Sequence, residues 1–229
     1  MQRHKHFFVF VLLALPLILC GQNTFSLTGG VSHSQLPIYS QKSNIRLINS
    51  QASNKLTFSF AYQQRLNNHF NSSVGISYSN LGINSFNQQL DQAEFFLNSV
   101  SIEYFRLSYV PKGEIQFGKL TLAAGIGGAI SYAISSKIQN YLLVDNSLEF
   151  LEKEDSSNKD FDAGIVLNLE LRRVIGNGLN LIFLLEKYQG VIDASTIDDS
   201  LNELYISSYA MRIGLQFPIK NKRPSLIKN

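Results

Sequence analysis

Tryptophan is absent from this 229-residue chain, and its one cysteine, Cys20, lies near the N-terminus. A single cysteine cannot form an intramolecular disulfide, so the fold is expected to depend on backbone hydrogen bonds and packing. Charged residues make up only 16% of the chain, and no basic stripe is interleaved with aromatic residues, which argues against nucleic-acid binding. Beyond residue 21, no apolar run approaches the roughly 20 residues that a membrane-spanning helix needs.

The first 21 residues have the layout of a secretory signal peptide. A basic start precedes the apolar run 7–19, which is too short to span a bilayer. We place the cleavage site after Gly21. Cys20 raises the alternative of a lipoprotein signal, but such signals carry a small residue before the cysteine, and this chain has the bulky Leu19. Residues 1–21 are therefore predicted to be a signal peptide.

The segment 120–135 alternates apolar and small residues more regularly than any other part of the chain. Its even-numbered positions are mostly leucine and isoleucine, and its odd-numbered positions are threonine, serine, glycine and alanine. Because a strand reverses its side chains at every residue, the two sets lie on opposite faces. The second face is small and uncharged, unlike a surface meant for bulk water. The pattern predicts a transmembrane barrel wall with lipid outside and a packed interior.

Seven further stretches alternate in the same way, which gives eight predicted strands. A barrel strand shows lipid only every second residue, and the near-zero mean hydropathy of the chain agrees with this. Residues 22–219 are therefore predicted to form one barrel domain. The predicted strands are 24–34, 55–66, 70–81, 97–110, 117–135, 161–174, 178–189 and 206–219.

The gaps between these strands alternate in length. Short gaps cover 67–69, 111–116 and 175–177, and long gaps cover 35–54, 82–96, 137–160 and 190–205. An even number of strands also returns the chain to its starting side of the membrane. We predict an all-β, eight-stranded antiparallel up-and-down transmembrane β-barrel with short periplasmic turns and long external loops. The basic tail 220–229 would then be periplasmic, where it either binds anionic lipid head groups or is solvated.

Aromatic residues fall at both ends of the predicted strands. Aromatic girdles mark the two membrane interfaces of outer-membrane barrels, and here tyrosine and phenylalanine would form them without tryptophan. The alternative explanation is the ordinary preference of aromatic residues for strands. The predicted periplasmic set is Phe25, Tyr62, Tyr109, Phe117 and Phe217, and the predicted external set is Tyr78, Tyr132 and Tyr209.

The predicted fourth strand changes phase along its length. Ile102 and Tyr104 share one parity, whereas Phe105 and Leu107 share the other. A bulge near Tyr104 and Phe105 would restore an apolar outer face, and a shorter strand is the alternative.

With that bulge, the charged residues of the strands point inward. A lysine or arginine facing lipid at the bilayer midplane costs about 2–4 kcal/mol, and an eight-stranded barrel is just wide enough for side chains to fill it. We therefore predict a lumen filled by ion pairs and hydrogen bonds, with an ion pathway or a catalytic carboxylate as the alternative. The inward set is Glu103, Arg106, Glu170, Arg172, Glu186 and Arg212.

Three segments resemble the PorT-like family of outer-membrane β-barrel proteins. Residues 161–171, which read F-D-A-G-I-V-L-N-L-E-L, resemble the family phrase F-D-x-G-L-x-x-G-x-G-x-E on its sixth strand. Residues 179–191 resemble the next strand, and residues 104–127 resemble the central segment. Asn168 stands where glycine is usual, and Ser108 stands where proline is usual. The resemblance implies an integral outer-membrane protein, and one branch of the family serves protein secretion and motility.

The search for catalytic and metal-binding patterns gives little. His33 and His69 are predicted on opposite sides of the membrane, where they cannot share a metal ion. Ser32 and His33 are adjacent on a strand, so their side chains point to opposite faces and cannot form a dyad. The acidic segment 137–160 lacks the spaced aspartates of a calcium loop. We expect no cofactor, no metal ion and no catalytic site.

Three classes of function compete. The first is a structural or interaction barrel whose partners are outer-membrane lipid and envelope proteins, as a free component or within a secretion assembly. The second is an outer-membrane lipid-modifying enzyme, which needs a Ser/His/acid set at the lipid-exposed rim. The third is a barrel that carries a small ligand, either in a soluble apolar cavity or through its external loops. The small, uncharged inner faces favour the first class.

Overall fold

The computed structural model describes residues 23–35, 45–89, 95–144, 147–156, 161–176, 178–191 and 207–219. The predicted signal peptide 1–21 and the predicted tail 220–229 lie outside these residues. No helix in the described part of the chain is long and apolar enough to cross a membrane. The strands are β1 (Asn23–Gln35), β2 (Ile45–Arg65), β3 (Phe70–Gln89), β4 (Phe95–Phe117), β5 (Leu120–Val144), β6 (Ser147–Ser156), β7 (Phe161–Gly176), β8 (Leu179–Gly190) and β9 (Ser207–Pro218).

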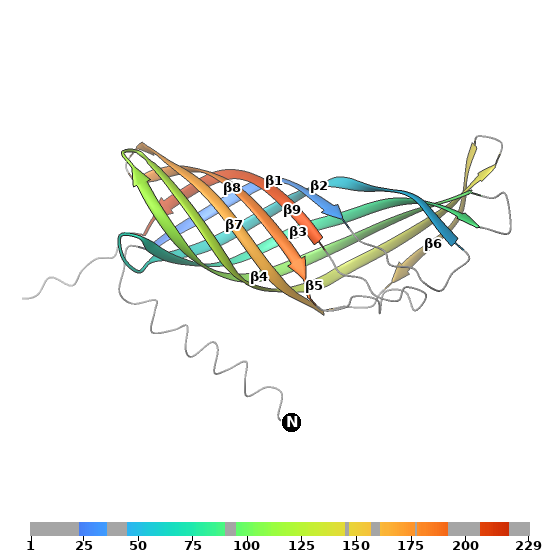
Figure 1. Ribbon diagram of the computed structural model, residues 1–229, viewed down its shortest axis with the longest axis horizontal. Coiled ribbons are helices and arrows are strands. Elements are labelled where there is room, and N and C mark those ends of the chain that lie inside the picture. The colour runs from blue at the N-terminus through green and yellow to red at the C-terminus, as the bar shows by residue number, and fades with distance from the viewer. Residues whose placement is uncertain are drawn as a thin grey trace, which may run out of the picture.

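The strands close into a ring, which confirms the predicted fold class (Figure 1). The order is β4-β3-β2-β1-β9-β8-β7-β5, and β5 pairs back with β4. All pairings are antiparallel, and β1 closes on β9 with Phe25 opposite Phe217. Eight of the nine strands belong to this ring, because β6 pairs only with β5 among the described strands.

One end of the barrel, here called the turn end, carries the tight connections. β4 and β5 are joined by Gly118 and Lys119, and Gly118 has a φ of 59°, which a glycine adopts without steric cost. The N–H of Ile219 donates to the carbonyl of Asn23 at 2.8 Å, so the first and last strands also meet at this end. The predicted turn 111–116 is wrong, because these residues continue β4. Lys112 and Glu114 are buried there and alternate with exposed residues, which is the alternation of a strand.

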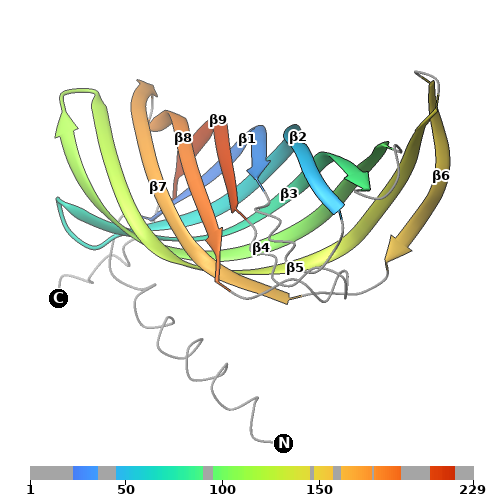
Figure 2. The same cartoon turned by 45° about the vertical axis from the view of Figure 1, so that its right-hand side comes forward.

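At the opposite end, here called the extended end, β2, β3, β4 and β5 continue well past the other strands (Figure 1). Ile45 pairs with Gln89, and Phe95 pairs with Leu143. β6 adds a further strand along β5 (Figure 2). Much of the predicted loops 35–54, 82–96 and 137–160 is therefore strand. Backbone hydrogen bonds between neighbouring strands can continue whatever the side-chain pattern. The alternation in these segments is weak, so the sequence does not predict the extensions.

The predicted bulge in the fourth strand is also wrong. β4 keeps one phase, with Ile102 and Tyr104 buried inside and Phe105 exposed outside. The register shift lies across from it on β5, where Glu103 pairs with Ser135 and Tyr104 pairs with Ala133. The extra residue, Ile134, is therefore on β5 and leaves the phase of β4 unchanged.

Close approach of β4 and β5 requires glycine at position 127. A Cβ built on Gly127 would collide with the carbonyl oxygen of Tyr109 and lie 2.8 Å from the Cα of Val110, whereas one on Gly128 meets nothing within 4 Å. We expect Gly127→Ala to lower the free energy of unfolding by roughly 1–3 kcal/mol. Gly128→Ala should stay within about 0.5 kcal/mol of the parent. Urea unfolding in phospholipid vesicles checks this, and equal midpoints for the two variants would contradict the β4–β5 register.

Candidate functional site: a lipid-facing wall and a filled lumen

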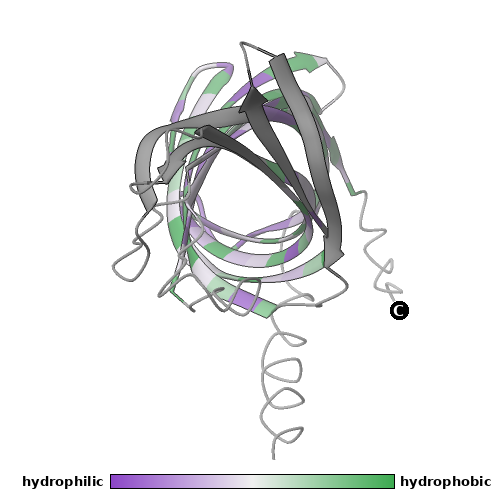
Figure 3. Ribbon diagram, turned by 90° about the vertical axis from the view of Figure 1, so that its right-hand side faces the viewer, coloured by the Kyte–Doolittle hydropathy of each residue, from purple (hydrophilic) through white to green (hydrophobic). Residues whose placement is uncertain are grey.

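The outer wall of the barrel is apolar because of strict side-chain alternation. Along β7, Leu167 and Leu169 point outward and are 46% and 44% exposed. Val166, the residue before Leu167, points inward and is 0% exposed. Burial alternates in the same way on the other ring strands where it is described, and apolar and polar residues follow one another along the coloured parts of the strands (Figure 3). At about 3.4 Å per residue and a tilt of about 40°, the rise from Leu122 to Tyr132 is roughly 26 Å, close to the ~25 Å apolar band of transmembrane barrels.

The outward aromatic residues lie near both ends of this wall. Toward the extended end, Tyr78, Phe105, Tyr132 and Phe161 are register neighbours on four adjacent strands. The Tyr78 and Phe105 rings are 5.8 Å apart, edge to face. Tyr209 is exposed on the far side of the ring, on β9.

Toward the turn end, Phe25 lies opposite Tyr62 on β2 and opposite Phe217 on β9. The ring centroids of Phe25 and Tyr62 are 5.5 Å apart. Tyr109 and Phe117 are also exposed on the outer wall of β4. The structure thus places all eight aromatic residues of the two predicted sets on the strand face that points outward.

Inside the barrel, one cluster of ion pairs lies toward the turn end. Glu170 accepts a hydrogen bond from Lys112 Nζ at 2.6 Å. It also forms an ion pair with Arg172, whose Nε lies 2.9 Å from the carboxylate. Arg172 also pairs with Glu114, and Arg65 Nε approaches Glu114 at 3.4 Å. The pairs form one chain from β2 through β4 to β7, so each carboxylate has two cationic partners.

Neutral amides complete this turn-end cluster. Gln63 Nε2 donates to Glu170 at 3.0 Å, and Gln216 Nε2 donates to Gln63 Oε1 at 2.7 Å. Asn71 Nδ2 donates to Glu114 at 2.7 Å. Buried carboxylates are tolerated when their remaining lone pairs are hydrogen-bonded, and these amides supply those bonds.

A second cluster lies further toward the extended end, around Glu186. Arg212 holds this carboxylate with two nitrogens, at 3.1 and 3.2 Å, and Arg106 Nη1 lies 3.6 Å from it. Arg212 Nε also donates to the Thr57 hydroxyl at 3.2 Å. Arg106 Nε donates to Ser131 Oγ at 3.0 Å. Arg212 is only 1% exposed, so it is fully removed from solvent.

Tyr188 links this second cluster to a carboxylate on β7. The Arg106 guanidinium lies 3.6 Å from the centre of the Tyr188 ring, and the Tyr188 hydroxyl donates to Asp162 at 2.6 Å. All three side chains are buried. The ring stacking and the hydrogen bond together hold Arg106 in place beside Glu186.

Of the six predicted lumen residues, five lie in these two clusters and Glu103 does not. Glu103 is half-buried and shares the outward parity of Phe105, so its predicted inward position is wrong. The reason is the continuous phase of β4, because the bulge that would turn Glu103 inward does not form there.

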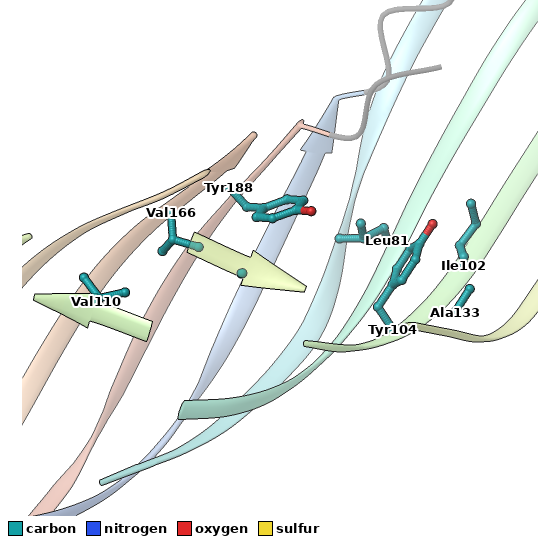
Figure 4. Close-up of a cluster of buried hydrophobic side chains, with 8 residues drawn as sticks. Leu81, Ile102, Tyr104, Val110, Ala133, Val166 and Tyr188 are labelled. Carbon is teal, nitrogen blue, oxygen red and sulfur yellow. The ribbon is translucent and has the colours of Figure 1, made fainter. Parts of the chain in front are cut away.

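Apolar side chains also enter the lumen. Leu81, Ile102, Tyr104 and Ala133 gather from β3, β4 and β5 toward the extended end (Figure 4). Val166 and Tyr188 belong to the same buried cluster. These residues are buried on the strand face that points into the barrel, which the sequence alone would assign to polar contacts.

A small cavity lies inside the barrel. The interior cavity between the two clusters has a volume of about 30 Å³ and is lined by hydroxyls together with Lys112, Glu170, Glu186 and Arg212. A water molecule needs on the order of 10–15 Å³ of such volume, so the cavity has room for one or two waters. Around it, the inward side chains of the described strands are buried and paired with one another.

Sequence reasoning missed several interior residues. Lys112 and Glu114 fall in the predicted turn 111–116, although their two-residue spacing beside Ile115 is a strand signal. Arg65 closes β2 at the turn end and is not part of the predicted inward set. Asp162 and Tyr188 carried no signal, because a carboxylate and a phenol on separate strands meet only through the β7–β8 register.

Nothing in this interior has the arrangement of a metal centre. Within the described residues, no group of three or more histidine, cysteine, aspartate or glutamate side chains could hold a metal ion. His33 lies on the outer face, where its Nδ1 is 3.0 Å from the Asn54 amide oxygen. The lumen carboxylates of Glu114, Glu170 and Glu186 are paired with lysine or arginine, and that of Asp162 accepts a hydrogen bond from Tyr188.

An apolar wall outside and paired charges inside together define a membrane-spanning β-barrel with a filled lumen. No family model and no curated protein sequence matches the chain. Among solved structures, Ail of Yersinia pestis has 11% sequence identity and a TM-score of 0.40, covering 86% of this chain and 99% of its own. The outer membrane protein OprG of Pseudomonas aeruginosa has 10% identity and a TM-score of 0.49, covering 88% and 98%. The outer membrane protease OmpT of Escherichia coli has 11% identity and a TM-score of 0.36, covering 86% and 97%.

Loss of Arg212 should destabilise the barrel strongly. Arg212→Met leaves Glu186 with only the longer contact to Arg106, and removing one partner of a buried ion pair costs roughly 3–5 kcal/mol. The matched control is Arg173→Met, because Arg173 is exposed on β7 near the turn end, where the change should stay within about 1 kcal/mol. Urea titration of both variants in vesicles measures the difference. An unchanged midpoint for Arg212→Met would refute the described interior.

Proposed function

We propose that this protein is an integral outer-membrane barrel that serves as a structural and interaction component of the envelope. The observation that carries the proposal is the division of its side chains, with apolar residues on the lipid side and paired charges within a filled lumen. A transporter needs a path for its solute, and the bore of an eight-stranded barrel is just wide enough for the inward side chains to fill it. Its work is therefore done at its surfaces.

The extended end is the surface best suited to a protein partner. There β2 to β6 form an open sheet beyond the ring, and no described strand pairs with the second edge of β6 (Figure 2). A free strand edge presents unpaired N–H and C=O groups that can accept an extended segment of another chain. A place in an envelope or secretion assembly is the kind of partnership that such an edge would serve.

We place the turn end in the periplasm and the extended end outside the cell. The short turns, the start of β1 and the end of β9 all lie at the turn end. Outer-membrane barrels have short periplasmic turns, and an even number of strands returns the chain to the side from which it started. The function proposed is non-enzymatic, since Glu114, Glu170 and Glu186 are paired with cations and the lipid-facing wall is apolar.

Single cysteines should distinguish the two sides of the membrane. In a Cys20→Ser background, Ser147→Cys at the start of β6 should react with an impermeant thiol reagent on intact cells, and Lys119→Cys in the β4–β5 turn should not. Both should react after the envelope is permeabilised, which serves as the control. Labelling of Lys119→Cys alone on intact cells would reverse the topology, and release of the protein by alkaline carbonate would refute membrane integration.

The filled lumen predicts an electrically silent barrel. In planar bilayers, the purified protein should show no stable large conductance at neutral pH, because paired charges and buried apolar side chains point into the narrow bore. A variant that empties part of the lumen, Tyr188→Ala, serves as the comparison. A reproducible wide channel formed by the parent protein would contradict the proposed role.

A further inference from the structure

A groove of about 650 Å³ crosses the outer wall over β5, β7, β8, β9 and β1. Its lower wall is apolar and includes Leu169, Leu185 and Met211, which are register neighbours on β7, β8 and β9. Its upper wall on β8, β9 and β1 is polar and consists of Lys187, Tyr209 and His33, again in register. A groove of this size falls within the range of small-ligand sites, about 300–1,000 Å³.

The groove slopes from the middle of the apolar wall toward the extended end. Ala124 marks one end, well below Tyr132 on β5, and His33 marks the other, two residues before β1 ends at Gln35. The four interstrand steps from β5 to β1 give a length of roughly 19 Å at about 4.8 Å per step. Because barrel strands tilt by about 35–45°, a groove perpendicular to them is inclined by the same angle to the membrane plane.

The polar end of the groove lies on the side of the barrel where the strands are short, here called the low side. β8 and β9 stop there within the described residues, whereas β2 to β5 rise past this level (Figure 1). Lys187 is half-buried, and its ammonium lies 5.3 Å from the centre of the Tyr209 ring. No carboxylate among the described residues pairs with it. An ammonium held at a membrane interface without a protein anion is positioned for an anion supplied by the membrane.

We propose that this groove binds a phosphate-bearing membrane lipid, with the phosphate on Lys187 and one acyl chain along Leu185 and Leu169 toward Ala124. The inference rests on the membrane location given under the proposed function. The phosphate accepts hydrogen bonds from the Lys187 ammonium, and the Tyr209 hydroxyl is a second donor at the same level. The apolar lower wall selects a ligand with a hydrocarbon chain, which inorganic phosphate lacks.

The absence of tryptophan permits a direct test. Phe183→Trp places one reporter on the outer wall, two residues along β8 from Leu185, and bromine on an acyl chain quenches tryptophan on contact. The reporter protein is inserted into phosphatidylcholine vesicles that contain a small fraction of either brominated phosphatidic acid or brominated phosphatidylcholine. We expect phosphatidic acid to be preferred about fivefold, the ratio given by ~1 kcal/mol for one basic residue near the membrane surface.

Variants then test each end of the groove. Lys187→Gln should abolish the preference, and Ala124→Phe should reduce it by filling the distal end. The control is Arg173→Gln, which removes an exposed cation at the turn end and should leave the preference unchanged. Ile213→Trp on β9 provides a second reporter if Phe183→Trp does not fold, because Ile213 lies opposite Phe183 in the β8–β9 register.

Equal quenching by the two brominated lipids would overturn the inference, as would equal losses of preference in Lys187→Gln and Arg173→Gln. Displacement of the lipid by excess inorganic phosphate would indicate an anion site without an acyl-chain groove, which also refutes the lipid assignment. These outcomes differ from a failure of the proposed function. A protein that does not span the membrane would show no quenching by brominated phosphatidylcholine at all.

Discussion

The closed backbone ladder is the constraint from which the other features follow. Within hydrocarbon, an unpaired N–H or C=O group costs several kcal/mol, so a sheet can cross a membrane only when its first and last strands pair. Here β1 meets β9 along their whole length, from Thr24 opposite Pro218 to Gln35 opposite Ser207. Closure at eight strands then fixes a bore that side chains must fill. The apolar wall and the packed lumen are the two consequences.

The buried charges of the lumen tie strands together that are distant in sequence. Lys112 on β4 meets Glu170 on β7, and Arg212 on β9 meets Glu186 on β8. Buried ion pairs contribute little net stability, because desolvation offsets their attraction. Their effect on register is larger, since a slip of one residue would carry Glu170 to the lipid face. The ion pairs therefore select one pairing register among those that the apolar pattern permits.

The strands are long on one side of the barrel, β2 to β5, and short on the other, β8, β9 and β1. The two sides therefore offer different contacts. On one side, here called the tall side, β2 to β6 extend past the ring, and no described strand pairs with the second edge of β6 (Figure 2). The low side, β8, β9 and β1, ends near Lys187 and Tyr209 at the interface. A protein partner on the tall side and a lipid on the low side would not compete for space. This asymmetry is the structural basis of both proposals.

The sequence by itself determined the period of the strands, the number of strands in the ring and the face that meets lipid. Alternation is a local property, and segments such as 161–171 show it without reference to any partner. It also identified Arg106, Glu170, Arg172, Glu186 and Arg212 as interior charges, because a charge on the lipid face is costly. Only the tertiary structure decided which of these charges meet, where Glu103 points and how far β2 to β5 extend. Those outcomes depend on the register between strands, which the sequence of a single strand does not determine. An example is the shift in the β4–β5 register between Glu103 and Tyr104.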